Sequence, residues 1–191
     1  PFYPSPLRDN GYDVAEYRAV DDRLGTLSEF EEFTTRAHER GIRVLTDLVF
    51  NHTSRDHEWF QRARTDPESG YHDYYLWTDH VEDAYNTVNI FPEYEDGVWS
   101  YDEAAAKWYF HQFYSHQPDL NVSNPAVRDE LHDVLRFWLD KGVDGFRIDA
   151  AHPMTLPKGH HGTEEGIWLF EEMKEIVRAE RDDAVLLAEA D

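Results

Sequence analysis

Residues 141–152 read K-G-V-D-G-F-R-I-D-A-A-H, in which a glycine, an apolar run and two charged residues follow one another. Apolar residues in 127–139 recur at helical spacing just before it, and Gly142 is placed to end that helix. The apolar residues after Gly142 predict a strand. Arg147 and Asp149 are two apart, so on a strand they point to the same face. They are either a structural ion pair or part of a site at the end of that strand.

The same order of elements occurs earlier in the chain. Ser28 is suited to be a helix N-cap, with Glu31 three residues later as in a capping box, and the helix is predicted to end near Gly41. Residues 42–50 are almost continuously apolar and β-branched. Such a run predicts a strand buried on both faces, as in a parallel sheet.

A third unit of this kind closes the chain. Residues 164–180 have a helical pattern, and residues 184–188 are an apolar run that predicts a strand ending at Glu189. Three helix-then-strand units in succession predict an α/β fold with a parallel sheet.

Residues 53–121 interrupt this order and are too numerous for an ordinary loop between a strand and a helix. They are rich in Trp, Tyr and Phe and are divided by turn-forming residues. We expect a small subdomain whose aromatic residues form mostly its core, with some available to stack on a sugar.

The composition limits the partners. The 191 residues include 40 acidic and 18 basic ones, for a net charge of −22, and only four are Lys. Salt screens such self-repulsion, so we expect a cytoplasmic protein from a high-salt organism. No basic stripe is available for nucleic acid, and no apolar run is long enough to cross a membrane. The chain has no Cys, which excludes disulfides and thiolate chemistry.

Polar residues follow each of the three predicted strands: Asn51 and His52, then Asp149, then Glu189. The C-terminal ends of parallel strands meet at one edge, where ligands bind. Two carboxylates across a cleft, one ionised and one protonated, are what glycosidic bond cleavage needs. We expect Arg147 to keep Asp149 ionised, and the apolar residues before Glu189 to keep that carboxyl protonated.

Four motifs carry a resemblance to a known family: D-L-V-F-N-H at 47–52, Q-P-D-L-N at 117–121, G-F-R-I-D-A at 145–150 and L-A-E-A at 187–190. In order and spacing the chain resembles the α-amylase superfamily of retaining glycoside hydrolases. The resemblance implies the central part of a (β/α)₈ TIM barrel, about strands 2–5. Residues 1–52 and 122–191 would then be barrel parts, and residues 53–121 a subdomain inserted after strand 3.

The resemblance also implies roles for individual residues. Asp149 would be the nucleophile and Glu189 the acid/base. The residues expected to bind the substrate are Asp9, Tyr12, His52, Gln117 and Arg147. The opening P-F-Y-P-S-P-L-R-D and the S-H-Q-P-D-L-N at 115–121 are most similar to trehalose synthases, which interconvert maltose and trehalose, with hydrolytic α-glucosidases as near neighbours.

Members of this superfamily often bind calcium, and Asn51 and Asp119 match its ligand positions with the oxygen atoms that calcium prefers. After Asp149 the chain reads A-A-H, where trehalose synthases supply a Glu ligand, so the calcium site is an expectation only. No organic cofactor is implied. The resemblance also requires a further Asp after the seventh strand, so the remainder of the barrel is needed and we expect a fragment that is inactive alone.

Two other interpretations are open. The chain could be a non-catalytic carbohydrate-binding or chaperone-like member of the same fold, although such a protein would not need both Asp149 and Glu189. It could also be a metal-dependent hydrolase that uses His52, Asp149 and Glu189, although no pair of metal-binding His residues on a helix supports that.

Overall fold

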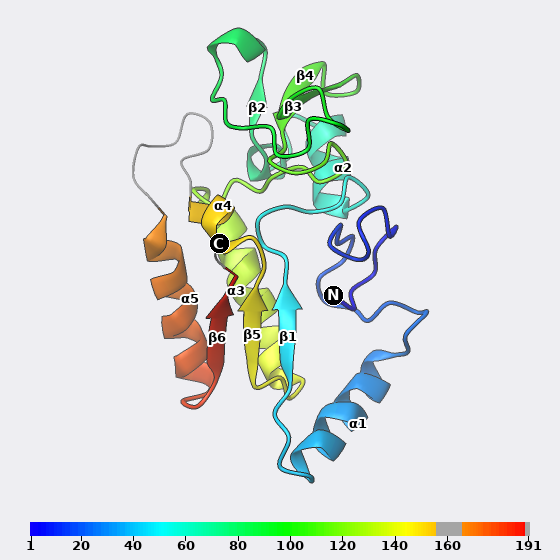
Figure 1. The fold of residues 1–191 in the computed structure, drawn as a ribbon, viewed down its shortest axis with the longest axis vertical. Helices are drawn as coiled ribbons and strands as arrows, with labels where there is room; N and C mark the ends of the chain where they lie inside the picture. Colours follow the sequence, from blue (N-terminus) through cyan, green and yellow to red (C-terminus); the bar gives the residue numbers. More distant parts are fainter. Residues whose placement is uncertain (156–165, 190–191) are drawn as a thin grey trace.

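The computed structural model describes residues 1–155 and 166–189. Residues 164 and 165 of the third predicted helix and Ala190 of the fourth motif lie outside these ranges. The described residues contain three helix-then-strand units and one inserted segment (Figure 1).

The three units form a parallel sheet in the order β1-β5-β6. Helices α3 and α5 pack against each other beside this sheet (Figure 1). A short helix, α4 (Ala151–Thr155), follows β5 directly. The units are α1 (Leu27–His38) with β1 (Leu45–Leu48), α3 (Pro125–Asp140) with β5 (Gly145–Ile148), and α5 (Ile167–Glu180) with β6 (Val185–Ala188). The prediction of three successive units with parallel strands is confirmed.

Helix α1 begins two residues earlier than predicted. Its N-cap is Thr26, whose side chain accepts from the backbone N–H of Glu29, while the Glu29 carboxylate accepts from the backbone N–H of Thr26. The prediction of Ser28 and Glu31 as the capping pair was therefore wrong. Both pairs have the same spacing in the sequence, and only the Thr26 pair lies where the chain turns into the helix.

The strand register separates two faces of the parallel sheet. Asp47 on β1 is paired with Arg147 on β5, which is paired with Leu187 on β6. The alternate residues, such as Phe146 and Ile148, face the other side and are buried. On the first face Leu45, Val185 and Leu187 are 44%, 44% and 56% exposed. The prediction that residues 42–50 are buried on both faces was therefore wrong for β1, which is also shorter than that range.

Strands β5 and β6 approach each other closely at Gly145. A Cβ atom at this position would lie 2.2 Å from the carbonyl oxygen of Val185. No side chain fits in that space, so Gly145 is required for the two strands to pair. This pairing brings the ends of β5 and β6 together.

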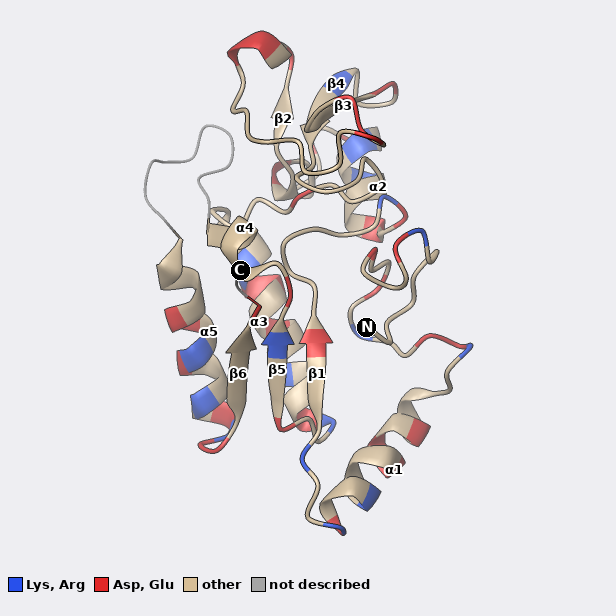
Figure 2. Ribbon diagram, viewed as in Figure 1, with Lys and Arg blue, Asp and Glu red and all other residues tan. Residues whose placement is uncertain are grey.

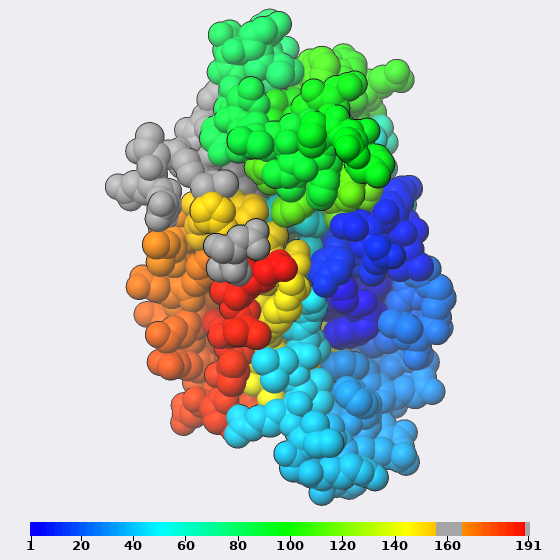
Figure 3. Space-filling model, in the orientation of Figure 1, coloured from blue at the N-terminus to red at the C-terminus, as the bar shows by residue number. Residues whose placement is uncertain are grey.

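The inserted segment forms a second, antiparallel sheet in the order β2-β4-β3. It lies above the C-terminal ends of β1, β5 and β6 (Figures 1 and 3). Its elements are α2 (Glu58–Thr65), η1 (His72–Tyr74), β2 (Trp77–Thr78), η2 (Val81–Asp83), β3 (Trp99–Asp102) and β4 (Lys107–Phe110). The buried Asp102 carboxylate pairs with Arg55 and Arg64 and so ties β3 to the helix α2 region.

The inserted segment and the parallel sheet share one apolar core. Trp59, Phe60 and Tyr109 of the insertion belong to the same buried cluster as Phe50 and Trp138 of the barrel part. A smaller cluster around Trp99 and Phe110 belongs to the insertion alone. The division into three parts at residues 52 and 121 stays a prediction.

Acidic residues occur along α1 and α5 and in the loops of the insertion (Figure 2). In residues 1–155 and 166–189, no helix combines the length and the apolar character needed to span a bilayer.

Candidate active site

The ends of the three parallel strands open into a pocket of about 660 Å³ between the sheet and the insertion. The parallel sheet supplies its charged floor. The insertion supplies an apolar wall. The lining residues include Asp9, Tyr12, His52, Val88, Ile90, Phe91, Phe113, Tyr114, Arg147, Asp149 and Glu189.

Arg147 bridges the two predicted catalytic carboxyls. Its Nη1 lies 3.0 Å from Oδ1 of Asp149, and its Nη2 lies 2.6 Å from Oε1 of Glu189. The second oxygen of Glu189 accepts the backbone N–H of Ala150 at 3.1 Å. Ala150 has a φ of 48°, an uncommon conformation for a residue with a side chain, and it directly follows Asp149. The two carboxyls therefore face one pocket, held by a common cation.

The protonation of this pair in the free protein differs from the prediction. Burial raises the pKa of Asp149 to about 7. The hydrogen bond from Arg147 lowers this pKa, whereas repulsion from the negative charges of Glu189 and Asp47 raises it further. The backbone N–H of Ala150 lowers the pKa of Glu189, helped by the charge of Arg147. The surroundings of Glu189 are polar and its side chain is 47% exposed, so the expectation of an apolar environment was wrong.

Because both carboxyls bind the same guanidinium, their ionisation is linked. Burial favours the protonated form of Asp149 by raising its pKa, whereas the backbone N–H of Ala150 favours the ionised form of Glu189 by lowering its pKa. A sugar that covers the exposed half of Glu189 would raise its pKa by desolvation, which favours moving the proton to Glu189.

Asp47 is a residue of this site that the sequence did not single out. Its two carboxylate oxygens lie 2.7 and 2.8 Å from Nη1 of Arg147. Tyr12, predicted to bind the substrate, donates its hydroxyl to the same carboxylate at 3.0 Å. Burial, followed by the charge of Asp47, raises the pKa of Tyr12 to about 12, so this hydroxyl stays a donor. The sequence did contain a signal for Asp47, because it is an acidic residue within the apolar run at residues 42–50.

His52 lines the pocket but both ring nitrogens have protein partners. Nε2 lies 3.0 Å from the backbone carbonyl of Tyr12, which can only accept, so Nε2 carries the proton. Nδ1 then accepts from the Asn51 side-chain amide at 3.1 Å. The ring is 2% exposed. Its position fits contact with a sugar, while donation to a sugar hydroxyl requires the bond to Tyr12 to be exchanged.

Asp9 and Gln117 are joined by a hydrogen bond of 2.9 Å, from the Gln117 amide to the Asp9 carboxylate. Asp9 lines the pocket, whereas Gln117 is fully buried and is not among the lining residues. The structure therefore places Gln117 behind Asp9, which it orients. Direct contact of Gln117 with the substrate stays a prediction, and the burial of Gln117 behind Asp9 does not support it.

The wall opposite the carboxyls is apolar. Phe91 stacks on Tyr114 with ring centroids 4.4 Å apart, and the ring of Phe113 lies 5.2 Å from that of His52. Val88 is 75% exposed and Ile90 42% exposed beside them. These side chains come from the insertion and give that side of the pocket an apolar surface.

The predicted calcium ligands contact each other. The Asn51 amide lies 3.2 Å from Oδ2 of Asp119, and Oδ1 of Asp119 accepts the backbone N–H of Gln112. In residues 1–155 and 166–189 there is no group of three or more His, Cys, Asp or Glu side chains placed to hold a metal ion. Calcium needs six to eight oxygens. Asn51 and Asp119 would supply only part of such a set, so the calcium site and the metal-dependent alternative stay predictions.

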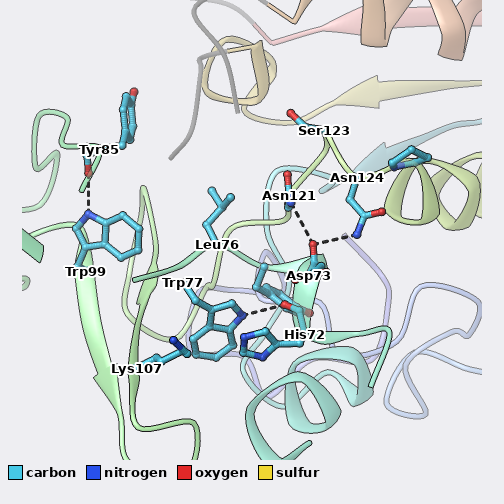
Figure 4. Close-up of a pocket in the computed structure, with 12 residues that line it drawn as sticks. His72, Asp73, Leu76, Trp77, Tyr85, Trp99, Lys107, Asn121, Ser123 and Asn124 are labelled. Atoms are coloured by element: carbon cyan, nitrogen blue, oxygen red, sulfur yellow. Dashed lines mark hydrogen bonds between the residues drawn. The ribbon is translucent and has the colours of Figure 1, made fainter. Parts of the chain in front are cut away.

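A second pocket of about 490 Å³ lies between the insertion and the start of α3 (Figure 4). It is lined by Trp77 and Trp99, which invites comparison with a sugar site. Trp77, however, is stacked between Phe60 and His72, and Trp99 donates its indole N–H to the carbonyl of Tyr85. Neither face of Trp77 is available for a sugar, so these rings serve packing.

The chain is similar to several characterised proteins. It is 45% identical over 192 residues to the trehalose synthase/amylase TreS of Mycobacterium tuberculosis. This alignment covers all of this chain and 32% of TreS. It is 43% identical over 150 residues to the oligo-1,6-glucosidase of Heyndrickxia coagulans, covering 78% of this chain and 27% of that protein. The chain spans about a third of the length of the curated relatives it matches.

The chain is also similar to solved structures. The trehalulose synthase MutB from Pseudomonas mesoacidophila MX-45 superposes with a TM-score of 0.85 at 34% identity, over 99% of this chain and 36% of that one. The α/β fold described above is therefore part of a TIM barrel. The family described as "Alpha amylase, catalytic domain" matches residues 1–191 in full. The chain belongs to the α-amylase family, of whose catalytic domain it forms a part.

Proposed function

We propose that this chain supplies the nucleophile and the acid/base of a retaining enzyme that acts on small α-glucosides. The observation that carries the proposal is the placement of Asp149 and Glu189 on neighbouring strand ends, both bonded to Arg147 in one pocket. A carbohydrate-binding protein has no need of two carboxyls that bind one arginine in the same pocket. It therefore remains only as an outcome of the test.

In the proposed reaction, a carboxylate oxygen of Asp149 attacks the anomeric carbon while Glu189 gives its proton to the leaving oxygen. The C–O bond to the leaving group breaks and a glucosyl ester forms on Asp149. Glu189, now ionised, removes a proton from the incoming hydroxyl, which attacks the same carbon and releases Asp149.

We propose that the incoming hydroxyl belongs to the released glucose, so that maltose and trehalose are interconverted. The apolar wall of Phe91, Phe113 and Tyr114 supports this, because it disfavours water beside the ester. The similarity to a trehalose synthase over the whole chain also supports it. Hydrolysis is the second candidate, favoured by the similarity to an oligo-1,6-glucosidase.

Further strands of the barrel must complete the proposed enzyme. The apolar residues Leu45, Val185 and Leu187 are exposed on the face of the sheet that carries Arg147. Strands β1 and β6 are also the edges of the described sheet. We propose that additional strands cover this face and pair with both edges.

The net charge of −22 motivates the proposal that this protein works in a high-salt cytoplasm.

The decisive experiment incubates the full-length gene product with maltose and identifies the products. Trehalose with little glucose supports transfer, and glucose alone supports hydrolysis. A slow fluorinated glucosyl substrate should leave a glucosyl ester on Asp149, visible by mass spectrometry. The absence of both turnover and label, with maltose still bound, would favour the non-catalytic alternative.

A further inference from the structure

Asp47 and Arg147 lie directly opposite each other on parallel strands β1 and β5. The Asp47 carboxylate contacts Nη1 of Arg147 through both oxygens, and the two side chains are 19% and 31% exposed. Asp47 has no place in the proposed bond-breaking steps and is not among the residues that line the pocket. The role of Asp47 must therefore come from its contact with the guanidinium of Arg147.

The orientation of Asp47 is fixed by the opening loop. Tyr12 donates its hydroxyl to Oδ2 of Asp47 at 3.0 Å. Tyr3, 1% exposed, donates its hydroxyl to the backbone carbonyl of Asp47 at 2.7 Å. Two tyrosines from one loop thus hold both the main chain and the carboxylate of Asp47. A carboxylate held in this way can hold its own partner in place.

Arg147 is consequently one cation among three carboxylates. Its Nη1 serves Asp47 and Asp149, and its Nη2 serves Glu189. Further titratable side chains line the same pocket: Asp9 and Tyr12 from the opening loop, His52 after β1, Tyr114 of the insertion and His152 of α4. Both oxygens of Asp47 contact the same terminal nitrogen that contacts Asp149, so Asp47 fixes where the guanidinium sits between Asp149 and Glu189. Without Asp47 the guanidinium would lose this anchor, and Asp149 and Glu189 would take a larger share of its charge.

We propose that Asp47 is a positioning residue: it holds the guanidinium of Arg147 in the place where it reaches both Asp149 and Glu189, and it takes up part of the guanidinium charge. This inference rests on the proposed function for its effect on catalysis. The arrangement of the four side chains does not depend on which hydroxyl resolves the intermediate.

The first test is Asp47→Asn in the full-length gene product, which keeps the shape of the side chain and removes its charge. We expect kcat on maltose to fall about tenfold or more, as for other groups that orient a reacting centre. We expect the acid limb of kcat/KM to move to lower pH by about one unit, because Asp149 loses a negative neighbour and gains a larger share of Arg147.

The matched control is Asp144→Asn. Asp144 is also a buried sheet carboxylate with an arginine partner, Arg181, but it lies at the opposite end of β5. This control should lower the unfolding temperature and leave the acid limb in place. If Asp47→Asn behaves like the control, losing stability without moving the acid limb, Asp47 is only structural and the proposal is wrong.

A second measurement does not depend on turnover. The ¹³C carboxyl signal of Asp149, assigned by its loss in Asp149→Asn, can be titrated in the sugar-free protein. We expect its midpoint to be lower in Asp47→Asn than in the wild type, and an unchanged midpoint overturns the proposal. Because this experiment needs no substrate, it decides the role of Asp47 even if full activity in Asp149→Asn disproves the proposed function.

If Asp47→Asn does not fold, Asp47→Glu provides the answer. It retains the charge and displaces it by one methylene group. We expect a lower kcat with an acid limb that moves by less than half a unit, since the guanidinium is displaced while the local charge is kept. Wild-type kcat in Asp47→Glu would overturn the positioning role.

Discussion

Asp149 and Glu189 are separated by 40 positions in the sequence and bind the two terminal nitrogens of the same guanidinium, that of Arg147. Strands β5 and β6 are adjacent and parallel, so the residues that follow them reach the same edge of the sheet. This relationship underlies the first two predictions below.

Asp149→Asn in the full-length gene product should lower turnover of maltose by roughly 10³-fold or more, because an amide cannot form the glucosyl ester. Steady-state kinetics with purified protein measure this. Asp183→Asn, which alters an exposed ion pair far from the pocket, serves as the control and should keep full activity. Turnover of Asp149→Asn within tenfold of the wild type would exclude Asp149 as the nucleophile.

The pH dependence of kcat/KM should rise with pH through an apparent pKa near 7, since Asp149 must be ionised to attack and burial raises its pKa to about 7. The raised pKa also affects stability. A carboxyl whose pKa is higher in the folded protein loses its contribution to stability as the pH rises from about 4 to 7. Asp149→Asn should therefore unfold at a higher temperature than the wild type at pH 8, with a smaller difference at pH 4. Equal unfolding temperatures at both pH values would contradict the shift.

Asp144→Asn should destabilise the fold by about 3 kcal/mol. Asp144 is 2% exposed, accepts the backbone N–H of Val44 at 2.7 Å, and pairs with His38 and Arg181. Burial opposes ionisation, but these partners lower its pKa overall, so its stabilising effect is present above about pH 4 and lost as the pH falls below that.

Urea unfolding at pH 7 and pH 3 measures both effects of Asp144→Asn. The exposed Asp183→Asn is the matched control and should leave the free energy of unfolding almost unchanged, because solvent screens its ion pair. A similar loss in both variants would show that burial of Asp144 is unimportant.

The unfolding temperature should be higher in 3 M KCl than in 0.1 M KCl, because the Debye length falls from about 10 Å to less than about 3 Å and the repulsion among 40 acidic residues is screened. Sucrose is excluded from the protein surface but does not screen charge, so it separates stabilisation by exclusion from stabilisation by screening. If sucrose stabilises the protein and KCl does not, the high-salt proposal fails.

Removal of divalent cations with a chelator should leave the unfolding temperature unchanged, because Asn51 and Asp119 bond to each other and, within residues 1–155 and 166–189, no group of three or more His, Cys, Asp or Glu side chains is placed to hold a metal ion. Differential scanning fluorimetry with EDTA, then with excess Ca²⁺, measures this. A calcium-dependent rise of several degrees would restore the calcium site predicted from the sequence.

Local patterns were sufficient to predict the elements but not their ends. The apolar run at residues 42–50 indicated a strand, but only Leu45–Leu48 pairs, with Gly145–Ile148. Two capping pairs with identical spacing, Thr26 with Glu29 and Ser28 with Glu31, could not be told apart. The choice depends on where the preceding chain turns, which is a tertiary property.

The sequence by itself determined that this is an α/β chain whose strands carry Asp149 and Glu189 to one edge, because the alternation of side chains and the order of helices and strands are local and periodic. Only the tertiary structure decided that burial raises the pKa of Asp149, that Gln117 lies behind Asp9, and that Asp47 contacts Arg147. Each of these depends on a distance or a degree of burial set by segments far apart in the chain. Electrostatic interactions fall off over a few ångströms, so spacing along the sequence does not fix them.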